Sequence, residues 1–226
     1  MIDRIIAGPL QTNVYVVATG KKECMVVDPG ADAALLLQRL ETLNVTPTAI
    51  IFTHGHLDHT SAAQAIVEHY ADRVPDMQIG IHRSDRPYLA PKGEATNRAL
   101  FEALGAEAVS AFESLYSSLP KSTFFLSDGE PILDTDFVTI HTPGHSQGSV
   151  CLYSEERGAL ISGDTLLFKT VGRTDVVGSD IDKLTKSITK TLFALPPDTR
   201  LFPGHGPNSV LEREIEFNDF TPNPQM

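Results

Sequence analysis

Cysteine is scarce in this chain, whose 226 residues include only Cys24 and Cys151. The two lie far apart in segments that read as strands, which argues against the disulfide framework typical of small secreted domains. They fit buried thiols in a reducing cytosol. The opening stretch, MIDRIIAGPLQTN, lacks the basic start and unbroken apolar run of a secretory signal. We therefore expect a cytoplasmic protein.

Long apolar runs and an excess of positive charge are also missing. No stretch is apolar for long enough to span a bilayer, so we expect no part embedded in a membrane. The chain has 18 Lys and Arg against 29 Asp and Glu, and its formal net charge is −11. This balance argues against nonspecific binding to nucleic acids or to anionic membranes. With 41% hydrophobic and 21% charged residues, the composition is otherwise that of an ordinary globular protein.

Two common catalytic signatures are absent as well. The stretch LLFKTVGRTD lacks the glycine spacing of a phosphate-binding P-loop, and no G-x-S-x-G elbow occurs anywhere in the chain. The second absence excludes a serine hydrolase of the nucleophile-elbow type.

The opening third of the chain alternates predicted strands and helices. NVYVVATGKKECMVVDPG reads as two strands joined by a turn at residues 20–22. Leu36, Leu40 and Leu43 recur at helical spacing and predict a helix that packs on a sheet. TAIIFT and MQIGIHRSD then read as two further strands.

Residues 84–122 interrupt this pattern, because they are polar, alanine-rich and only weakly periodic. We interpret them as an irregular, partly helical insertion that serves as a flap or an interface element. Further strand-like segments follow, then a helix over about residues 180–194 and a terminal helix. Since no repeat or low-complexity linker divides the chain, we predict a single domain over residues 1–226.

Four potential metal ligands crowd into THGHLDHTSA, between a predicted strand and a predicted helix. Open α/β sheets usually carry their chemistry at such strand ends. Residues two apart in an extended segment point to the same side, so His54 and His56 can bind one ion. Asp58 and His59 lie on the turn into the helix and can face a second ion. Imidazole and carboxylate ligands suit zinc, iron and manganese.

Three later strand-end loops supply further ligands, namely His145, Asp164 and His205. The seven residues divide into a three-histidine set (His54, His56 and His145), a mixed set (Asp58, His59 and His205) and Asp164, whose two oxygens can bridge both ions. Two ions roughly 3.5–4 Å apart can share a water and bring its pKa near neutrality. The sequence therefore predicts a hydrolytic site with two divalent ions, zinc first and iron or manganese as alternatives.

Six motifs now carry a resemblance: VVDPG, THGHLDHTSAA, HTPGHSQGSV, SGDTLL, VGRTD and PGHGP occur in this order. The chain resembles a metallo-β-lactamase-fold hydrolase over nearly its whole length, and in particular the small bacterial glyoxalase II-like enzymes. The resemblance implies an αββα sandwich, in which helices cover two mixed sheets and the metals lie along the strand-end edge. The family's ligand positions match all seven residues.

The resemblance also implies roles outside the ligand set. Asp28 would support the histidine loop as a hydrogen-bond acceptor, unless it is an ordinary turn aspartate. Arg173 would face the glutathione backbone, where its guanidinium could clamp a carboxylate, unless it forms an ion pair with Asp175 or another acid. Lys169 is a weaker candidate of the same kind, with a solvated lysine as the alternative. The remaining histidines, which we interpret as structural, are His69, His82 and His141.

The function we expect is hydrolysis of a thioester such as S-lactoylglutathione, an anionic thiol conjugate, by a bridging hydroxide that Asp58 orients. A persulfide dioxygenase with a single iron resembles the chain through the same histidine loop and GRTD segment. Lactonase, phosphodiesterase and β-lactamase activities remain open on the same scaffold. A non-enzymatic zinc protein is disfavoured, because closed structural sites are saturated by protein ligands, often cysteines. The thiol carrier, the metal and the oligomeric state stay open.

Overall fold

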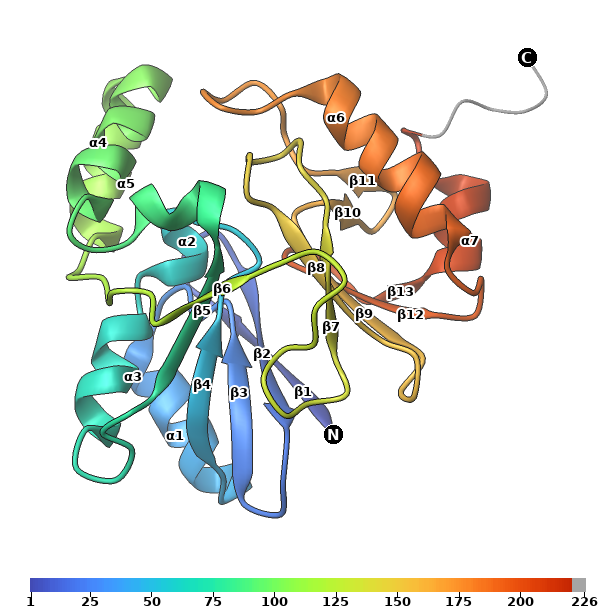
Figure 1. Cartoon of the computed structure of the whole chain (residues 1–226). Helices are drawn as coiled ribbons and strands as arrows, with labels where there is room; N and C mark the ends of the chain where they lie inside the picture. The colour runs from blue at the N-terminus through green and yellow to red at the C-terminus, as the bar shows by residue number, and fades with distance from the viewer. Residues whose placement is uncertain (221–226) are drawn as a thin grey trace. The chain divides into compact units, whose positions relative to one another are not determined.

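A computed structural model of the chain describes residues 1–220. It separates into two compact units, of which the first is Met1–Leu126 and the second begins at Ser127. Each unit is built on one main β-sheet with helices, and the ribbon in Figure 1 can be followed through both in chain order.

The first unit holds a six-stranded mixed sheet whose strands lie in chain order. Strands β1 to β3 pair antiparallel, and β3 to β6 pair parallel. The predicted turn at residues 20–22 does join two strands. The strands are β1 (Ile2–Ala7), β2 (Thr12–Ala18), β3 (Glu23–Val27), β4 (Thr46–Ile51), β5 (Gln78–His82) and β6 (Phe124–Leu126).

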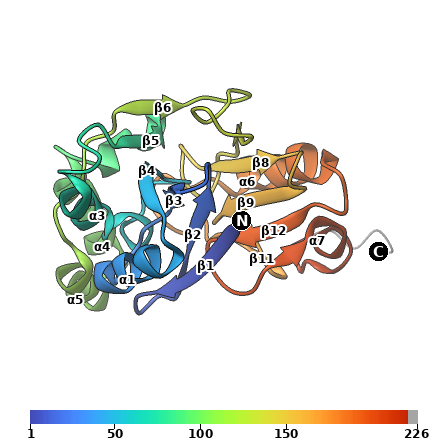
Figure 2. The same ribbon diagram turned by 90° about the horizontal axis from the view of Figure 1, so that it is seen from below.

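Helices connect the parallel strands, as parallel pairing requires. Helix α1 (Ala33–Leu43) buries Leu36 and Leu40 in the core of this unit, and Leu43 packs against the same core, as predicted from their spacing. The short helix α2 (Leu57–Thr60) and helix α3 (Ala63–Tyr70) follow β4. Figure 2 shows α1 and α3 on one side of the sheet.

The segment over residues 84–122 is more regular than its sequence suggests. It contains the 3₁₀ helix η1 (Arg83–Tyr88), α4 (Gly93–Leu104) and α5 (Ala106–Leu115). Alanine-rich stretches favour helix without large apolar side chains, so the periodic signal is weak. The packing rests on few residues: Phe112 lies 5.6 Å from Phe101 and 5.0 Å from Tyr116 between ring centroids.

The second unit holds a five-stranded sheet in the order β13-β12-β9-β8-β7. Only β9 and β12 pair parallel, and the chain between them includes a helical stretch over the predicted range. That stretch is α6 (Ile181–Lys186), the π-helical η2 (Ser187–Thr191) and η3 (Leu192–Ala194). The other elements are β7 (Val138–His141), β8 (Val150–Ser154), β9 (Ala159–Gly163), β10 (Leu166–Leu167), β11 (Thr170–Val171), β12 (Arg200–Pro203), β13 (Ser209–Val210) and α7 (Leu211–Phe217).

Both cysteines are buried free thiols, as expected. Burial raises the pKa of Cys24 to about 12 and that of Cys151 to about 11, so neither is a thiolate at neutral pH. Over residues 1–220, no helix is both long and apolar enough to cross a membrane.

Candidate metal centre

In the first unit, the loop after β4 gathers three imidazoles beside one carboxylate. His56 is still extended, with φ −64° and ψ 147°, and Asp58 and His59 lie in the following helix α2. The His54 ring centroid lies 4.7 Å from that of His56 and 4.2 Å from that of His59. All three histidines are buried. We call His54, His56, Asp58 and His59 the first half-site.

Asp28, at the end of β3, connects this loop to the neighbouring strand. One of its oxygens accepts the Thr53 N–H at 2.8 Å, and the other accepts the Thr53 hydroxyl at 2.6 Å. The second oxygen also lies 3.0 Å from Nδ1 of His59. Because a carboxylate only accepts, His59 carries its hydrogen on Nδ1 and presents Nε2, which lies 3.5 Å from Asp58 Oδ2. A carboxylate that orients an imidazole in this way is usual around protein-bound metals.

Gly30, in the same VVDPG motif, makes the closest main-chain approach. A Cβ at this position would lie 1.6 Å from the carbonyl oxygen of Asp58. Only glycine leaves room for the turn after β3 to pack against the backbone of α2. Thr12, from β2, adds a contact of 3.5 Å between its hydroxyl and Asp58 Oδ2.

In the second unit, three strand-end loops bring one carboxylate between two imidazoles. Asp164 follows β9 and His205 follows β12, and these parallel neighbours end side by side, with Gly204 N–H donating to Gly163 at 2.8 Å. Oδ2 of Asp164 lies 3.7 Å from Nε2 of His145 and 3.6 Å from Nε2 of His205. We call His145, Asp164 and His205 the second half-site.

The VGRTD motif supports His145 through its main chain. Nδ1 of His145 lies 2.9 Å from the carbonyl oxygen of Arg173. A Cβ on Gly172 would lie 1.9 Å from the Asp164 carbonyl oxygen and 2.9 Å from Nδ1 of His145. Sequence reasoning missed Gly172 and the Arg173 carbonyl, although a glycine just before the arginine was a signal for close packing.

The Arg173 guanidinium forms the ion pair that the sequence left open. Its Nε and one terminal nitrogen donate to the two oxygens of Asp175 at 2.7 and 2.8 Å. This pairing holds the pKa of Asp175 at about 2. Both side chains are exposed, so the pair is a surface one of the kind that contributes little to stability.

Lys169 and the other three histidines make local contacts. The Lys169 ammonium lies 5.5 Å from the centre of the Phe168 ring, and its main-chain N–H donates to Glu214 at 2.7 Å. Each remaining histidine has a neighbour near it in sequence: the partners are Arg73 for His69, Ser84 for His82 and Gln147 for His141.

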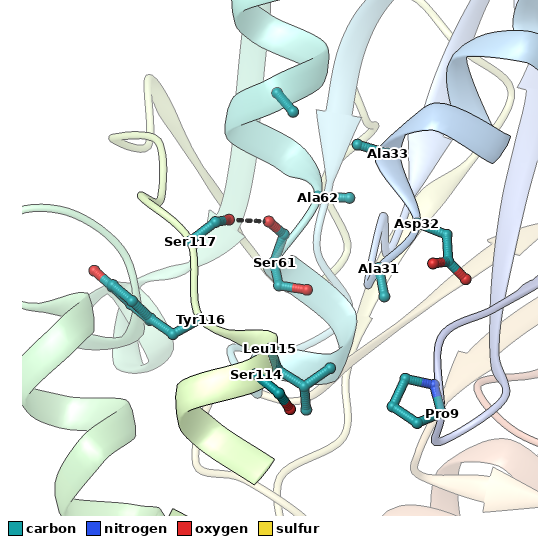
Figure 3. A pocket seen from close by; sticks show the side chains of 11 residues that line it. Pro9, Ala31, Asp32, Ala33, Ser61, Ala62, Ser114, Leu115, Tyr116 and Ser117 are labelled. Carbon is teal, nitrogen blue, oxygen red and sulfur yellow. Dashed lines mark hydrogen bonds between the residues drawn. The ribbon is translucent and has the colours of Figure 1, made fainter. Parts of the chain in front are cut away.

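A cavity of about 500 Å³ lies in the first unit, next to the chain that leaves the histidine loop (Figure 3). Small and apolar side chains make up much of its wall, and the single charged residue that lines it is Asp32. In Figure 3 Ser117 points toward Ser61, whose carbonyl accepts its hydroxyl hydrogen. Among residues 1–220, no cationic side chain and none of the seven candidate ligands lines this cavity.

The seven donors suit a divalent metal. Five imidazoles and two carboxylates match the ligand preferences of zinc, iron and manganese, whereas calcium and magnesium prefer oxygen. Nε2 of both His54 and His56 is buried, as is Oδ1 of Asp164. Buried polar atoms of this kind are what an inner-sphere metal site requires, so the residues present fit the metal.

Comparison with known proteins identifies the family of the chain. The family model described as the metallo-β-lactamase superfamily matches residues 7–205. Hydroxyacylglutathione hydrolase GloC of Haemophilus influenzae is 30% identical over 222 residues, which are 97% of each protein. The crystal structure of the BLEG-1 B3 metallo-β-lactamase has a TM-score of 0.83 and 32% identity, covering 97% of this chain and 99% of that one. The crystal structure of TTHA1623 in a di-iron-bound form has a TM-score of 0.82 and 33% identity, covering 97% and 100%.

The seven candidate histidine and aspartate positions lie within the range 7–205 that the family model covers. The expectation drawn from the sequence motifs is confirmed at the level of family and fold. The chain belongs to the metallo-β-lactamase superfamily, as a metal-dependent hydrolase with that family's fold.

Proposed function

We propose that the two half-sites together hold a pair of divalent ions and that the chain hydrolyses thioesters. The observation that best supports this proposal is the position of Asp164, whose Oδ2 lies within 3.7 Å of Nε2 of both His145 and His205. A carboxylate that binds two ions would lie close to a histidine ligand of each ion. The proposed sets are His54, His56 and His145 for one ion and Asp58, His59 and His205 for the other, with Asp164 in common.

The chain's own residues would orient the ligands and the attacking water. When bound, the metal pair supplies Lewis-acid activation of the substrate carbonyl and of a water molecule. Asp28 and the Arg173 carbonyl hold the Nδ1 hydrogens of His59 and His145, so both rings offer Nε2. Asp58, with Oδ2 beside Nε2 of His59, would orient the attacking water. The leaving group is a thiolate, and because a thiol has a pKa of only about 8.5, this anion can depart without first being protonated.

The substrate we propose is an anionic thiol conjugate such as S-lactoylglutathione, and zinc, iron and manganese are the candidate metals. The name of the Haemophilus influenzae relative supports this substrate class, since its similarity to the chain extends over nearly the full length of both proteins. Arg173 is the candidate residue for a substrate carboxylate, although Asp175 competes for its guanidinium. Lys169 is the weaker candidate, and the nearby ring of Phe168 gives it a packing contact instead.

The test is loss of S-lactoylglutathione when purified protein is loaded with zinc, iron or manganese in turn. We expect turnover that a chelator abolishes and added metal restores, with two ions bound per chain. Asp164→Ala should lose most bound metal together with activity. Asp198→Ala, an exposed aspartate of the same unit, is the matched control and should lose neither.

Three results would contradict the proposal. An active Asp164→Ala variant with its full metal content would refute the shared carboxylate. Hydrolysis of a β-lactam without any thioester turnover would favour a β-lactamase activity, as in the name of BLEG-1. Oxygen uptake with glutathione persulfide, in iron-loaded protein that leaves thioesters intact, would replace hydrolysis by dioxygenase chemistry.

A further inference from the structure

The first unit contains one buried carboxylate that the proposed reaction does not use. Asp85, in η1, is 1% exposed, and its Oδ2 accepts the main-chain N–H of Gly55 at 3.0 Å. Gly55 is the residue between His54 and His56. A buried main-chain N–H that lost this acceptor would be left unsatisfied, at a cost in folding free energy. Asp85 therefore fixes the backbone at the midpoint of the histidine pair.

Tyr88, at the other end of η1, packs against Gly55 as well. A Cβ on Gly55 would lie 2.5 Å from Tyr88 side-chain atoms, so the absence of a side chain lets the phenol ring lie on the loop. The ring also meets His56 edge to face, with 5.6 Å between centroids and an interplanar angle of 84°. Such a contact restricts the rotation of the imidazole.

Helix α4 anchors η1 in turn. Asn97 is buried, and its amide nitrogen donates to the carbonyl oxygens of Tyr88 at 3.1 Å and Gly93 at 2.9 Å. A Cβ on Gly93 would lie 2.6 Å from the same Tyr88 oxygen. These contacts at the Tyr88 carbonyl hold the end of η1 in place against α4.

The far end of the segment touches the same loop and the helix after it. Phe112 of α5 packs with Leu57, the residue after His56, in a small buried cluster. The Ser117 hydroxyl donates to the carbonyl of Ser61, two residues after His59 (Figure 3). Residues 84–122 therefore contact positions 55, 56, 57 and 61 in succession.

We propose that this segment is a positioning element for the histidine loop, with Asp85 holding the Gly55 N–H and Tyr88 holding the His56 ring. It sets the geometry in which His54 and His56 meet a metal ion. The inference rests on the proposed metal site and gives the insertion a role other than a flap. Asp85 acts through Gly55, and Tyr88 acts through His56.

Cobalt(II) binding tests the inference without any thioester, because the visible spectrum reports coordination geometry and a titration reports affinity. Asp85→Ala leaves the Gly55 N–H without its acceptor. We expect affinity for one of two cobalt ions to fall by about 10–100-fold, as for other outer-shell partners, with a shifted spectrum. Asp85→Asn keeps an acceptor oxygen and should recover much of both.

Tyr88 provides an independent pair of variants in case Asp85→Ala fails to fold. Tyr88→Ala should change the cobalt spectrum, whereas Tyr88→Phe keeps the ring and should not. Leu100→Ala is the stability control, since Leu100 is a buried apolar residue of the same helical segment, in α4. It should lower the melting temperature and leave cobalt binding as in the original protein.

Three negative outcomes are distinguishable. If Asp85→Ala and Tyr88→Ala lower only the melting temperature, as Leu100→Ala does, and bind cobalt normally, the segment is merely structural and the inference is wrong. If the unaltered protein binds no cobalt, the proposed metal site fails and the inference fails with it. Normal cobalt binding without thioester turnover would contradict the proposed function alone.

Discussion

Nδ1 of His145 donates its hydrogen to the main-chain carbonyl of Arg173, across 2.9 Å. A carbonyl oxygen cannot donate, so the contact selects the tautomer in which Nε2 carries the lone pair. Asp28 does the same for His59 in the other unit, at 3.0 Å. One imidazole of each half-site is thus prepared for a metal by a group outside the ligand set.

The first prediction separates the main chain of Arg173 from its side chain. Arg173→Ala keeps the carbonyl that holds His145, so metal content should stay unchanged. Asp175→Asn removes the carboxylate that occupies the guanidinium, and we expect the KM for S-lactoylglutathione to fall a few-fold as the cation becomes available. Steady-state kinetics and metal analysis on both variants check this. An unchanged KM in Asp175→Asn would remove Arg173 from the substrate site.

The second prediction concerns Gly172. Alanine would place a Cβ 1.9 Å from the Asp164 carbonyl oxygen and 2.9 Å from Nδ1 of His145, so the backbone must shift at two ligands. We expect Gly172→Ala to lose about 1–3 kcal/mol of unfolding free energy and to bind zinc more weakly. Gly20→Ala is the control, because a Cβ there meets its nearest neighbour at 3.5 Å. Denaturant titrations and zinc titrations on both variants should differ accordingly, and equal behaviour would refute the close-packing argument.

The third prediction concerns Asp28. Asp28→Asn keeps one acceptor oxygen but loses the negative charge that favours the hydrogen on Nδ1 of His59, and the amide also competes as a donor. We expect about 10–100-fold weaker binding of one metal ion. Asp32→Asn is a control from the same loop, since its carboxylate accepts only from Gly8 N–H among the contacts described. If Asp28→Asn binds metal as tightly as the unaltered protein, Asp28 is an ordinary turn aspartate with no role in metal binding.

The fourth prediction is a pH dependence of stability in the metal-free protein. Two hydrogen bonds from Arg157, at 2.7 and 2.6 Å, are the main reason that the pKa of Asp136 lies below its usual value. A carboxyl whose folded pKa is depressed adds stability above its unfolded pKa of about 3.9, and that stability is lost as pH falls through the folded pKa. Acidification below about pH 4 should therefore weaken the native protein through this pair.

Asp136→Asn cannot titrate and tests this directly. It should unfold about 1–2 kcal/mol more easily than the original at pH 7, and the difference should shrink in acid. Urea unfolding at several pH values measures the difference, with Asp198→Asn as an exposed control. A gap that stays constant down to the acid limit would show that packing, and no ionised pair, is responsible.

Much of the first unit was predictable because its signals are local. Leu36 and Leu40 repeat at the spacing of one helix face, and both are buried in α1. His54 and His56 follow an apolar strand, and Asp58 and His59 lie on the helix that begins after it. Residue type, spacing and the strand-to-helix change are written in adjacent positions, so the chain could be assigned to a family and a metal chemistry without coordinates.

Other features depended on the tertiary structure because the interacting groups are far apart or belong to the main chain. Asp85 reaches Gly55 across 30 positions, and neither residue type indicates the other. Arg173 was a candidate for its charge, whereas its carbonyl holds His145 and its guanidinium is paired with Asp175. A sequence specifies which side chains are available at each position. Only the packing of strands and loops decides which main-chain carbonyls accept hydrogens from those side chains. The same packing decides at which positions only glycine fits.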